Sequence, residues 1–360
     1  MSQVKRVGCL VLIVSMLLPI LAGCGQPGGS DEEKETRAFT DSAGREVQIP
    51  VDVERIAPVG PWAQLILYTL CPDKLVGYST SLTRKQKAYM DEKYWDLPVF
   101  GHYYGSTNAD MNYEALIAAK PDFIIDIGDT QDNIVADMDG LQEQTGIPAI
   151  FIESSILNTP EMYTLLGEAT GDTEKAETLS AYAQETLDMA EANREQITDE
   201  NRVSVLYGQG EYGLHVAGAG GDHARVLEVV GVENVAVLEN VSAAGRDEVS
   251  IEQVLLWDPD ILILAPDSNY SNIYKDTTWS VVNAVKNKRV YEIPESPYNW
   301  IDQPPSVQGL LGIRWLGNLA YPELYDLDML AEATTFFDLF FHYDLSEDEA
   351  RALMANSTFS

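Results

Sequence analysis

The feature that most constrains the fold is one pattern that recurs in the two halves of the chain. Residues 113–129 and 251–267 start 138 positions apart, and Glu, Pro-Asp and a closing Asp recur in them at identical spacings. Each segment predicts a short helix that ends before Pro-Asp, followed by a buried apolar strand of the kind found in parallel sheets. Unless the repeat is a coincidence, the chain forms two similar α/β lobes, and the cleft between them is the expected ligand site.

Length and charge fit two lobes and exclude one class of partner. The 360 residues are 45% apolar, which is enough for two cores of ordinary size. Lys and Arg number 23 against 57 Asp and Glu, which gives a net charge of −34. Because so acidic a chain repels a phosphate backbone, nucleic acid is not an expected partner.

The N-terminus has the pattern of a lipoprotein signal peptide. Lys5 and Arg6 precede the apolar run 7–20, which is too short for an ordinary membrane span. The run leads into Leu-Ala-Gly-Cys, a bacterial lipobox, which predicts that Cys24 is lipidated; a simple secretion signal with an incidental cysteine is the alternative. Cys71 then has no partner, so no internal disulfide is expected.

The chain divides into a series of predicted regions. They are the signal peptide 1–23, a flexible Gly-rich and charged tether 24–36, an N-terminal α/β lobe 37–170, an inter-lobe helix 171–199 and a C-terminal α/β lobe 200–360. A diacyl group on a tether would hold the protein at the cell membrane, on its extracytoplasmic face.

Alternating strands and helices are expected in both lobes. The first begins with a β-hairpin over 39–50, in which Ser-Ala-Gly forms the turn and Val47 and Ile49 face inward. Further strands are expected over 55–59, 75–78, 123–127, 149–152, 203–207, 214–216, 261–264 and 290–293, and helices over 62–70, 224–230 and 305–319.

The inter-lobe helix is predicted over 174–197, a stretch without Gly or Pro, with Asp172 or Thr173 as its N-cap. Its apolar face consists of Ala176, Leu179, Ala183, Leu187 and Ala190. About 24 residues at 1.5 Å per residue make a rod of ~36 Å, which is long enough to span both lobes.

Loops with aromatic side chains supply candidate ligand contacts. Ligands of α/β folds bind at loops that follow the carboxyl ends of strands, and aromatic rings offer large contact areas there. The candidates are Trp62, His102, Tyr103, Tyr104, Tyr212 and Trp300. Packing at the edges of the lobes is the alternative role for these rings.

Other kinds of chemistry have weaker support. The Gly-rich segment 218–223 could present N–H groups to an anion, but it lacks the Lys-Ser/Thr of a P-loop and is better explained as a structural turn. His102, His215, His223 and His342 lack metal-ligand spacing, although a bare-ion site built from the first three with a carboxylate stays open. No nucleophile motif supports an enzyme.

In this order, these motifs resemble the helical-backbone class of substrate-binding lipoproteins of ABC importers, the iron-siderophore and vitamin B12 receptor family. The resemblance rests on 40–47, 55–58, 112–114, 120–122, the long helix, 216–218 and 250–255. It implies two α/β lobes joined by one rigid helix, with the ligand in a shallow cleft. It also implies permease docking by Glu114 and Glu252, although acids in a first helical turn also complement the helix dipole.

The resemblance leaves the ligand open. Residues 299–306 and 311–316 are similar to the branch of molybdate and tungstate receptors, in which a basic residue is common where Gln303 stands. The cleft loops lack the arginine cluster that an anionic siderophore or oxyanion would favour, and Arg246 and Arg84 are the remaining candidates. Haem is a further option, because histidine and tyrosine are axial-ligand types.

The expected function combines these observations. We expect a monomeric, membrane-anchored lipoprotein, neither an enzyme nor the holder of a resident cofactor, that captures a metal complex of the iron-siderophore, haem or corrinoid class. It would deliver this chelate to an ABC permease dimer with its ATPase. The alternatives are a receptor for molybdate, tungstate or a bare metal ion, a metallo-enzyme on a two-lobed scaffold, and an adhesion lipoprotein.

Overall fold

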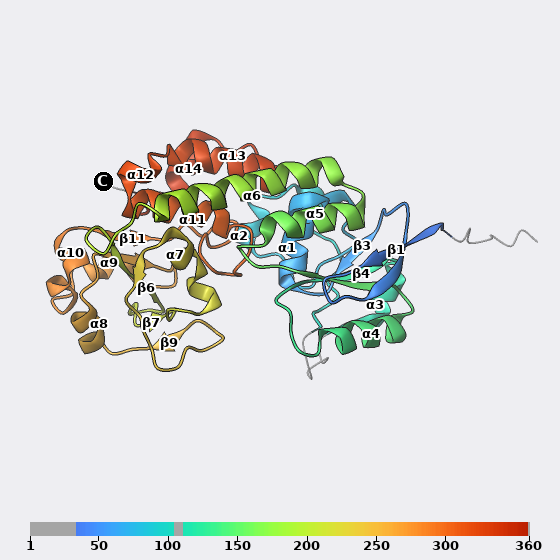
Figure 1. Cartoon of the computed structure of the whole chain (residues 1–360), viewed down its shortest axis with the longest axis horizontal. Coiled ribbons are helices and arrows are strands. Elements are labelled where there is room, and N and C mark those ends of the chain that lie inside the picture. Colours follow the sequence, from blue (N-terminus) through green and yellow to red (C-terminus); the bar gives the residue numbers. More distant parts are fainter. Residues whose placement is uncertain (1–33, 104–110, 359–360) are drawn as a thin grey trace, which may run out of the picture. The chain divides into compact units, whose positions relative to one another are not determined.

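The computed structural model describes residues 34–103 and 111–358, which form β-sheets flanked by α-helices (Figure 1). The strands are β1 (Thr36–Thr40), β2 (Glu46–Pro50), β3 (Ile56–Pro58), β4 (Phe123–Gly128), β5 (Ala149–Glu153), β6 (Ser204–Gln209), β7 (His215–Val216), β8 (Glu233–Asn234), β9 (Asp247–Glu248), β10 (Ile261–Leu264) and β11 (Val290–Glu292).

The helices lie between and around these strands. They are α1 (Pro61–Leu70), α2 (Arg84–Lys87), α3 (Tyr113–Ala118), α4 (Ile134–Thr145), α5 (Thr159–Thr170), α6 (Thr173–Arg194), α7 (Arg225–Val230), α8 (Ile251–Trp257), α9 (Tyr270–Ile273), α10 (Asn283–Lys286), α11 (Gly309–Ala320), α12 (Pro322–Tyr325), α13 (Met329–Phe341) and α14 (Glu347–Leu353). Short 3-10 helices include η1 (Pro72–Lys74), η2 (Glu92–Tyr94), η4 (Asp222–Ala224) and η5 (Trp279–Val281). Within the described residues, no helix has the length and apolar character needed to cross a membrane.

Each half of the chain contributes one main sheet. In the first half, β3, β4 and β5 pair in that order and are all parallel. In the second half, the order is β11-β10-β6-β7-β9, with β8 beside β6; β11, β10, β6 and β8 are parallel, whereas β7 and β9 are antiparallel additions. The α/β class is therefore confirmed.

The repeat seen in the sequence is a repeat of structure. Helices α3 and α8 start at equivalent residues, and the side chains of their N-caps, Asn112 and Ser250, each accept a hydrogen bond from the backbone N–H three residues on. The residues before each Pro-Asp, Lys120 and Asp258, have φ of 47° and 43°, which stops the helices as expected. The strands that follow, β4 and β10, lie inside the two sheets.

The alternation of side chains along these strands divides the core into three parts. Ile125 and Ile127 of β4 lie in the same hydrophobic cluster as Ile261 and Ile263 of β10, and we call it the shared core. On the opposite faces, β4 packs on α3 and α4 in a first outer core, whereas β10 packs on α8, α9 and α10 in a second. Both sheets therefore rest on one common core.

Helix α6 runs along the shared core and contacts elements of both halves (Figure 1). It packs against α1 and α5 from the first half and against α7 and α11 from the second. The predicted apolar face is confirmed for Ala176, Leu179, Ala183 and Ala190, which are buried, whereas Leu187 is half-buried. Asp172 is the N-cap by position, but its side chain makes no capping hydrogen bond. Glu35–Ser360 form one unit, so the lobe boundaries stay predictions.

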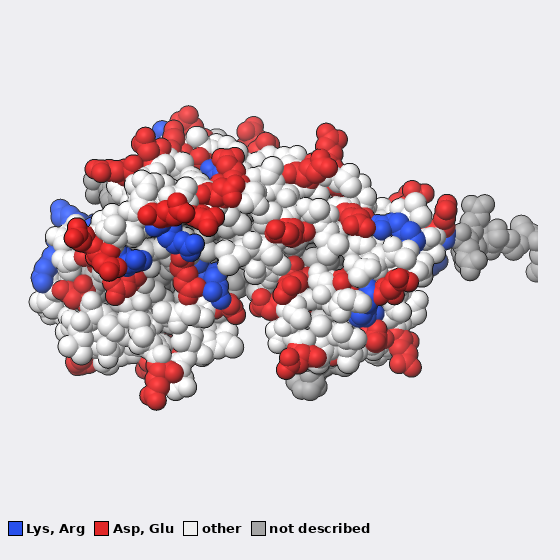
Figure 2. Space-filling view, viewed as in Figure 1, with Lys and Arg blue, Asp and Glu red and all other residues white. Residues whose placement is uncertain are grey.

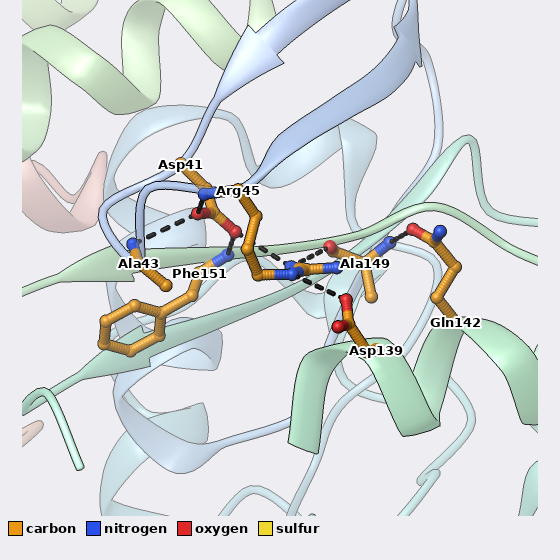
Figure 3. Close-up of polar contacts among 7 residues, drawn as sticks. All are labelled: Asp41, Ala43, Arg45, Asp139, Gln142, Ala149 and Phe151. Carbon is orange, nitrogen blue, oxygen red and sulfur yellow. Dashed lines mark hydrogen bonds and ion pairs between the residues drawn. The ribbon is translucent and has the colours of Figure 1, made fainter. Parts of the chain in front are cut away.

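The predicted hairpin is confirmed and is tied to the first sheet by one arginine (Figure 3). Val47 and Ile49 are buried as expected. The Arg45 guanidinium bonds Asp41 and Asp139 at 2.9 Å each and the Ala149 carbonyl at 2.8 Å. Asp41 in turn accepts the N–H of Phe151 at 3.2 Å, so the hairpin is fixed to β5.

Two expected elements differ in the structure. The stretch 75–78 makes isolated parallel bridges at Leu75 and Tyr78 instead of a continuous strand. The helix expected over 305–319 begins only at Gly309, because Pro305 and Ser306 belong to a bent segment that lines a cavity.

Candidate functional site

A cleft between the two sheets is formed by adjoining cavities that share Trp62 and Asp129. One cavity has Ile156 of the first half on one side and Val226, Ile301 and Pro305 of the second half on the other. A second, of about 440 Å³, lies between Asp129 and the segments 222–223 and 302–305. Residues from both halves of the chain therefore form the walls.

The first sheet places its contributions at the carboxyl ends of parallel strands. Trp62 lies in the first turn of α1 just after β3, Asp129 directly follows β4, and Ile156 follows β5. Such strand ends meet at one edge of a sheet, which is where α/β folds bind ligands. The Trp62 ring lies beside Gly128 at the end of β4, since a Cβ built at Gly128 would lie 3.6 Å from the ring, an ordinary van der Waals distance.

The cleft is acidic, and acidic residues also predominate on the face of the molecule shown in Figure 2. Desolvation raises the pKa of Asp129, and the nearby carboxylates of Asp222 and Glu153 raise it further. Arg225 also lines the cleft. Its guanidinium group is already paired with the carboxylates of Asp222 at 3.1 Å and Glu228 at 2.7 Å. The cleft therefore offers little free positive charge.

A buried hydrogen-bond chain supports one wall of the cleft. Asp302, which is 1% exposed, accepts hydrogen bonds from the Tyr207 hydroxyl at 2.7 Å and from His223 Nδ1 at 2.9 Å. The hydrogen bond to Asp302 raises the pKa of His223, although burial of the ring opposes this. The Asp302 carboxylate thus fixes the orientation of the one histidine that lines the described cleft cavities.

Gln303 stands where the resemblance to molybdate and tungstate receptors favours a basic residue. It belongs instead to a hydrogen-bond network of uncharged groups. Its side-chain N–H donates to Gln209 at 3.3 Å, and Gln209 donates to the Gly245 carbonyl at 2.6 Å. Gln303 lines the cleft cavity beside Asp302 and a neighbouring cavity beside Arg84 and Lys85. The Lys85 ammonium is paired with Glu295.

The structure separates the aromatic candidates. Trp62 lines all the cleft cavities, and Tyr103, 9% exposed, lines the one that extends towards α4. Tyr212 is 69% exposed and lines none of the described cavities, and His102 is also absent from their walls. Trp300 is 1% exposed in the shared core, so its ring is not available to a ligand in this arrangement.

Three further candidates have distinct surroundings. Tyr104 and Cys24 lie outside the described residues. Arg246 forms an ion pair with Asp267, which also accepts the N–H of Gly210, and it lines none of the described cavities. Its guanidinium is therefore part of a structural pair.

The two docking candidates occupy equivalent exposed positions. Glu114 and Glu252 lie in the first turns of α3 and α8. Within the described part of the chain, neither carboxylate has a hydrogen bond or an ion pair to another side chain. Figure 1 shows both helices on the side of the molecule away from α6.

The sequence reasoning missed most of the polar residues that line the cleft. The sequence marks Asp129 only as the last residue of the repeat and Asp222 only as part of a Gly-rich segment, whereas His223 is a candidate only for a bare-ion site. Asp126, in the middle of an apolar strand, gave no signal except its charge. No group of three or more His, Cys, Asp or Glu residues in the described ranges could hold a metal ion.

Known proteins of similar sequence and structure identify the family. A solute-binding protein of an ABC transporter from Sulfurospirillum deleyianum is 30% identical, with a TM-score of 0.79 over 89% of this chain and 99% of its own. An uncharacterized ABC transporter substrate-binding lipoprotein, YvrC of Bacillus subtilis, is 24% identical over 80% of this chain and 90% of its own. The molybdate-binding protein MolA of Haemophilus influenzae is 27% identical, over 46% of this chain and 48% of its own.

The family match covers most of the two sheets. Residues 61–297 match the family described as periplasmic binding protein, a range that includes Trp62, Asp129, Asp222 and His223. Together with the two-sheet fold and the cleft between the sheets, this match shows that the chain belongs to the periplasmic binding protein family, as an extracytoplasmic substrate-binding protein of an ABC transporter.

Proposed function

We propose that this protein captures a metal complex of the iron-siderophore, haem or corrinoid class and delivers it to an ABC permease dimer with its ATPase. The observation that carries this proposal is the composition of the cleft: Trp62, Ile156, Val226 and Pro305 form apolar walls beside the carboxylate of Asp129. Apolar walls with a few polar groups suit an organic ligand, and a chelate presents such a surface around its metal.

The negative charge of the cleft ranks the three ligand classes by how well their own charge fits it. Burial raises the pKa of Asp129, the nearby carboxylates of Asp222 and Glu153 raise it further, and Arg225 is neutralised by its own ion pairs. An anionic chelate, such as haem with its propionates or a catecholate complex, would be repelled. A neutral or cationic complex, such as a corrinoid or a cationic ferric hydroxamate, is favoured.

The similarity to a molybdate-binding protein supports an oxyanion receptor as the second candidate. A tetrahedral oxyanion needs several free N–H donors or cations. Gln303 and Arg225, which would have to supply them, are engaged with Gln209 and with Asp222 and Glu228. The cleft of this chain therefore suits an oxyanion less well than a neutral or cationic chelate.

Isothermal titration calorimetry with a panel of ligands tests the proposal. We expect cobinamide or a cationic ferric hydroxamate to bind, haem to bind more weakly, and molybdate, tungstate and Zn²⁺ not to bind. Trp62→Ala should weaken binding by about 10-fold or more, since an aromatic wall contributes up to ~1.5 kcal/mol beyond its buried area. Tyr212→Ala is the matched control, because its exposed ring lies outside the cleft cavities.

Two outcomes would contradict this assignment. Tight binding of molybdate with no binding of any chelate would favour the oxyanion receptor. An unchanged affinity in Trp62→Ala together with a loss in Tyr212→Ala would place the ligand outside the cleft.

We also propose that Cys24 anchors the protein by a lipid, as the lipobox indicates. The Bacillus subtilis relative, whose name includes lipoprotein, supports this proposal. Cys24→Ala should move the protein from the membrane fraction to the soluble fraction or leave it uncleaved. Membrane-bound, lipid-labelled Cys24→Ala protein would contradict it.

A further inference from the structure

Asp126 is an ionisable residue in the middle of an apolar strand. Its neighbours Ile125 and Ile127 on β4 face the shared core, so the alternation of the strand directs Asp126 to the opposite face, towards α4. There it lines a cavity of about 370 Å³ that adjoins the cleft through Trp62 and Asp129. The side chain of Asp126 therefore borders a cavity, although both of its neighbours along the strand are apolar.

The Asp126 carboxyl group is buried and only half satisfied. The residue is 9% exposed, and one carboxylate oxygen accepts the N–H of Ile127 at 3.0 Å. The other oxygen has no hydrogen bond or ion pair to any residue in 34–103 or 111–358. Burial raises the pKa of Asp126 to about 6, and the charge of Asp137 adds to the effect. Buried polar groups in proteins are ordinarily paired, and strongly perturbed carboxyl groups gather at functional sites.

The other polar and aromatic residues that line this cavity carry no positive charge. Asp137 on α4 and Asp129 after β4 contribute carboxylates, and Asn133, which donates to Asp137, and Gln131 contribute amide groups. The rings of Trp62 and Tyr103 form further walls. No Lys, Arg or His is among the described residues that line this cavity. An anion is therefore excluded by charge.

The spacing of the carboxylates decides between two kinds of cation. Within the described ranges, no three acidic, His or Cys residues are grouped closely enough to hold a metal ion. An organic cation with several N–H donors can reach separate carboxylates, and it can also lie against aromatic faces.

We propose that this cavity binds a protonated amine or guanidinium group of the ligand held in the cleft. The unpaired oxygen of Asp126 accepts a hydrogen bond from the cationic group, with Asp137 and Asp129 beside it and the Trp62 ring over it. This inference rests on the proposed function, since it adds a cationic arm to the ligand of the same cleft. It predicts that a substrate without such an arm binds more weakly than one with it.

Isothermal titration calorimetry of the mature chain at neutral pH tests the inference with small probes. Putrescine and agmatine carry the cationic groups, and butanediol is the neutral analogue of putrescine. We expect both amines to bind and butanediol not to bind. Asp126→Asn should weaken amine binding by at least about 10-fold, because it replaces a charge-assisted hydrogen bond by a neutral one. Asp132→Asn, an exposed acid in the same loop region, should change it by less than about two-fold.

The outcomes separate this inference from the proposed function. Amine binding lost in Asp126→Asn but kept in Asp132→Asn supports the amine site, even if no metal complex binds to the cleft. Binding of metal complexes without any amine binding, equal binding of butanediol, or an unchanged affinity in Asp126→Asn would overturn the amine site while leaving the proposed function intact. Loss of the folded state does not confuse the test, because removal of a buried charge is not expected to destabilise the protein.

Discussion

The two copies of the repeat, 113–129 and 251–267, share a backbone but differ at the residues that face the cleft. Both have a side-chain N-cap, a residue with positive φ before Pro-Asp, and a buried strand within a sheet. Their aspartates after proline also act alike: Asp122 accepts the N–H groups of Glu54 and Arg55, and Asp260 accepts that of Ser204. These shared positions build the scaffold.

Two equivalent positions line the described cavities in the first copy but not in the second. Asp126 of the first copy occupies the place of Leu264 in the second, and Leu264 is fully buried in the outer core of its sheet. Asp129 lines the cleft, whereas its equivalent Asp267 is paired with Arg246. The equivalent strands β4 and β10 therefore differ: β4 supplies a charged side chain to a cavity, whereas β10 supplies an apolar side chain to the core.

The largest expected effect comes from giving the second copy the charge of the first. Leu264→Asp should lower the free energy of unfolding by about 4 kcal/mol or more, because the carboxylate replaces a packed side chain and has no partner or cavity there. Urea denaturation at neutral pH measures this. Leu264→Ala, which removes volume without adding charge, should cost less. A Leu264→Asp protein of unchanged stability would show that the second copy also tolerates a charge.

Removal of the charge from the first copy should stabilise the protein. The Asp126 carboxyl has a pKa of about 6 instead of 3.8, so burial of its charge costs about 3 kcal/mol at neutral pH. Asp126→Asn should recover a gain of up to this size above pH 6. The gain should shrink as pH falls below 6 and vanish only below about pH 3, under the unfolded-state pKa of 3.8, because the wild-type carboxyl is then protonated in both states.

Denaturant melts of both proteins across this pH range measure the difference in stability. Asp132→Asn, at an exposed site, should show no such pH-dependent gain. A constant difference between Asp126→Asn and wild type at all pH values would contradict a raised pKa.

Both copies also share an exposed acid, Glu114 in the first and Glu252 in the second. If Glu114 and Glu252 each contact a basic residue of the permease, the double change to Ala should weaken docking by about 100-fold or more, since charge-assisted contacts contribute ~1.5–3 kcal/mol each. Each single change should have a smaller effect, and affinity for the ligand should not change. Uptake assays and titration of the permease with each variant measure this.

Glu143→Ala, which removes an exposed acid on the neighbouring α4, is the matched control for docking. Raised salt should weaken the wild-type complex towards the level of the double variant. Full uptake by the double variant, with a slight loss of thermal stability, would instead assign both acids to the helix dipoles alone.

The smallest expected effect concerns the residues that stop the two helices. Lys120 and Asp258 both have positive φ, which costs a non-glycine residue roughly 1–2 kcal/mol. Lys120→Gly should therefore stabilise the protein by about 0.5–1 kcal/mol after the extra chain entropy of glycine is subtracted. Asp258→Gly should gain less, because the Asp258 carboxylate accepts the N–H of Asn283 at 2.6 Å. Equal gains in denaturant melts would contradict this difference.

Local chemistry explains why much of the fold could be predicted. The helix ends at Asn112, Ser250, Lys120 and Asp258 depend on residues within a turn of each end, and the repeat made them visible twice. The hairpin over 39–50 was equally local, since its turn and its inward residues are adjacent. Such features need no knowledge of the rest of the chain.

The candidate site was less predictable because ring orientation depends on tertiary packing. Trp300 and Tyr212 both follow strands in aromatic loops, yet one lies in the shared core and the other in solvent. Trp62 lines the cleft, with its ring beside Gly128 on the neighbouring strand. Asp126 was passed over because an apolar run was expected to be buried core, and only the structure shows the cavity in front of it.

The shared core has a consequence for the speed of ligand capture. Arg314 on α11 bonds Thr186 of α6 at 2.9 Å and Glu332 of α13 at 2.8 Å, and α13 packs in turn against α1 of the first half, so the shared core joins both halves. A ligand then meets walls that need little rearrangement, and its association rate should follow encounter, at about 10⁵–10⁷ M⁻¹s⁻¹, instead of a slow opening step. For a cationic ligand the field of a chain with a net charge of −34 should raise this rate, and added salt should lower it.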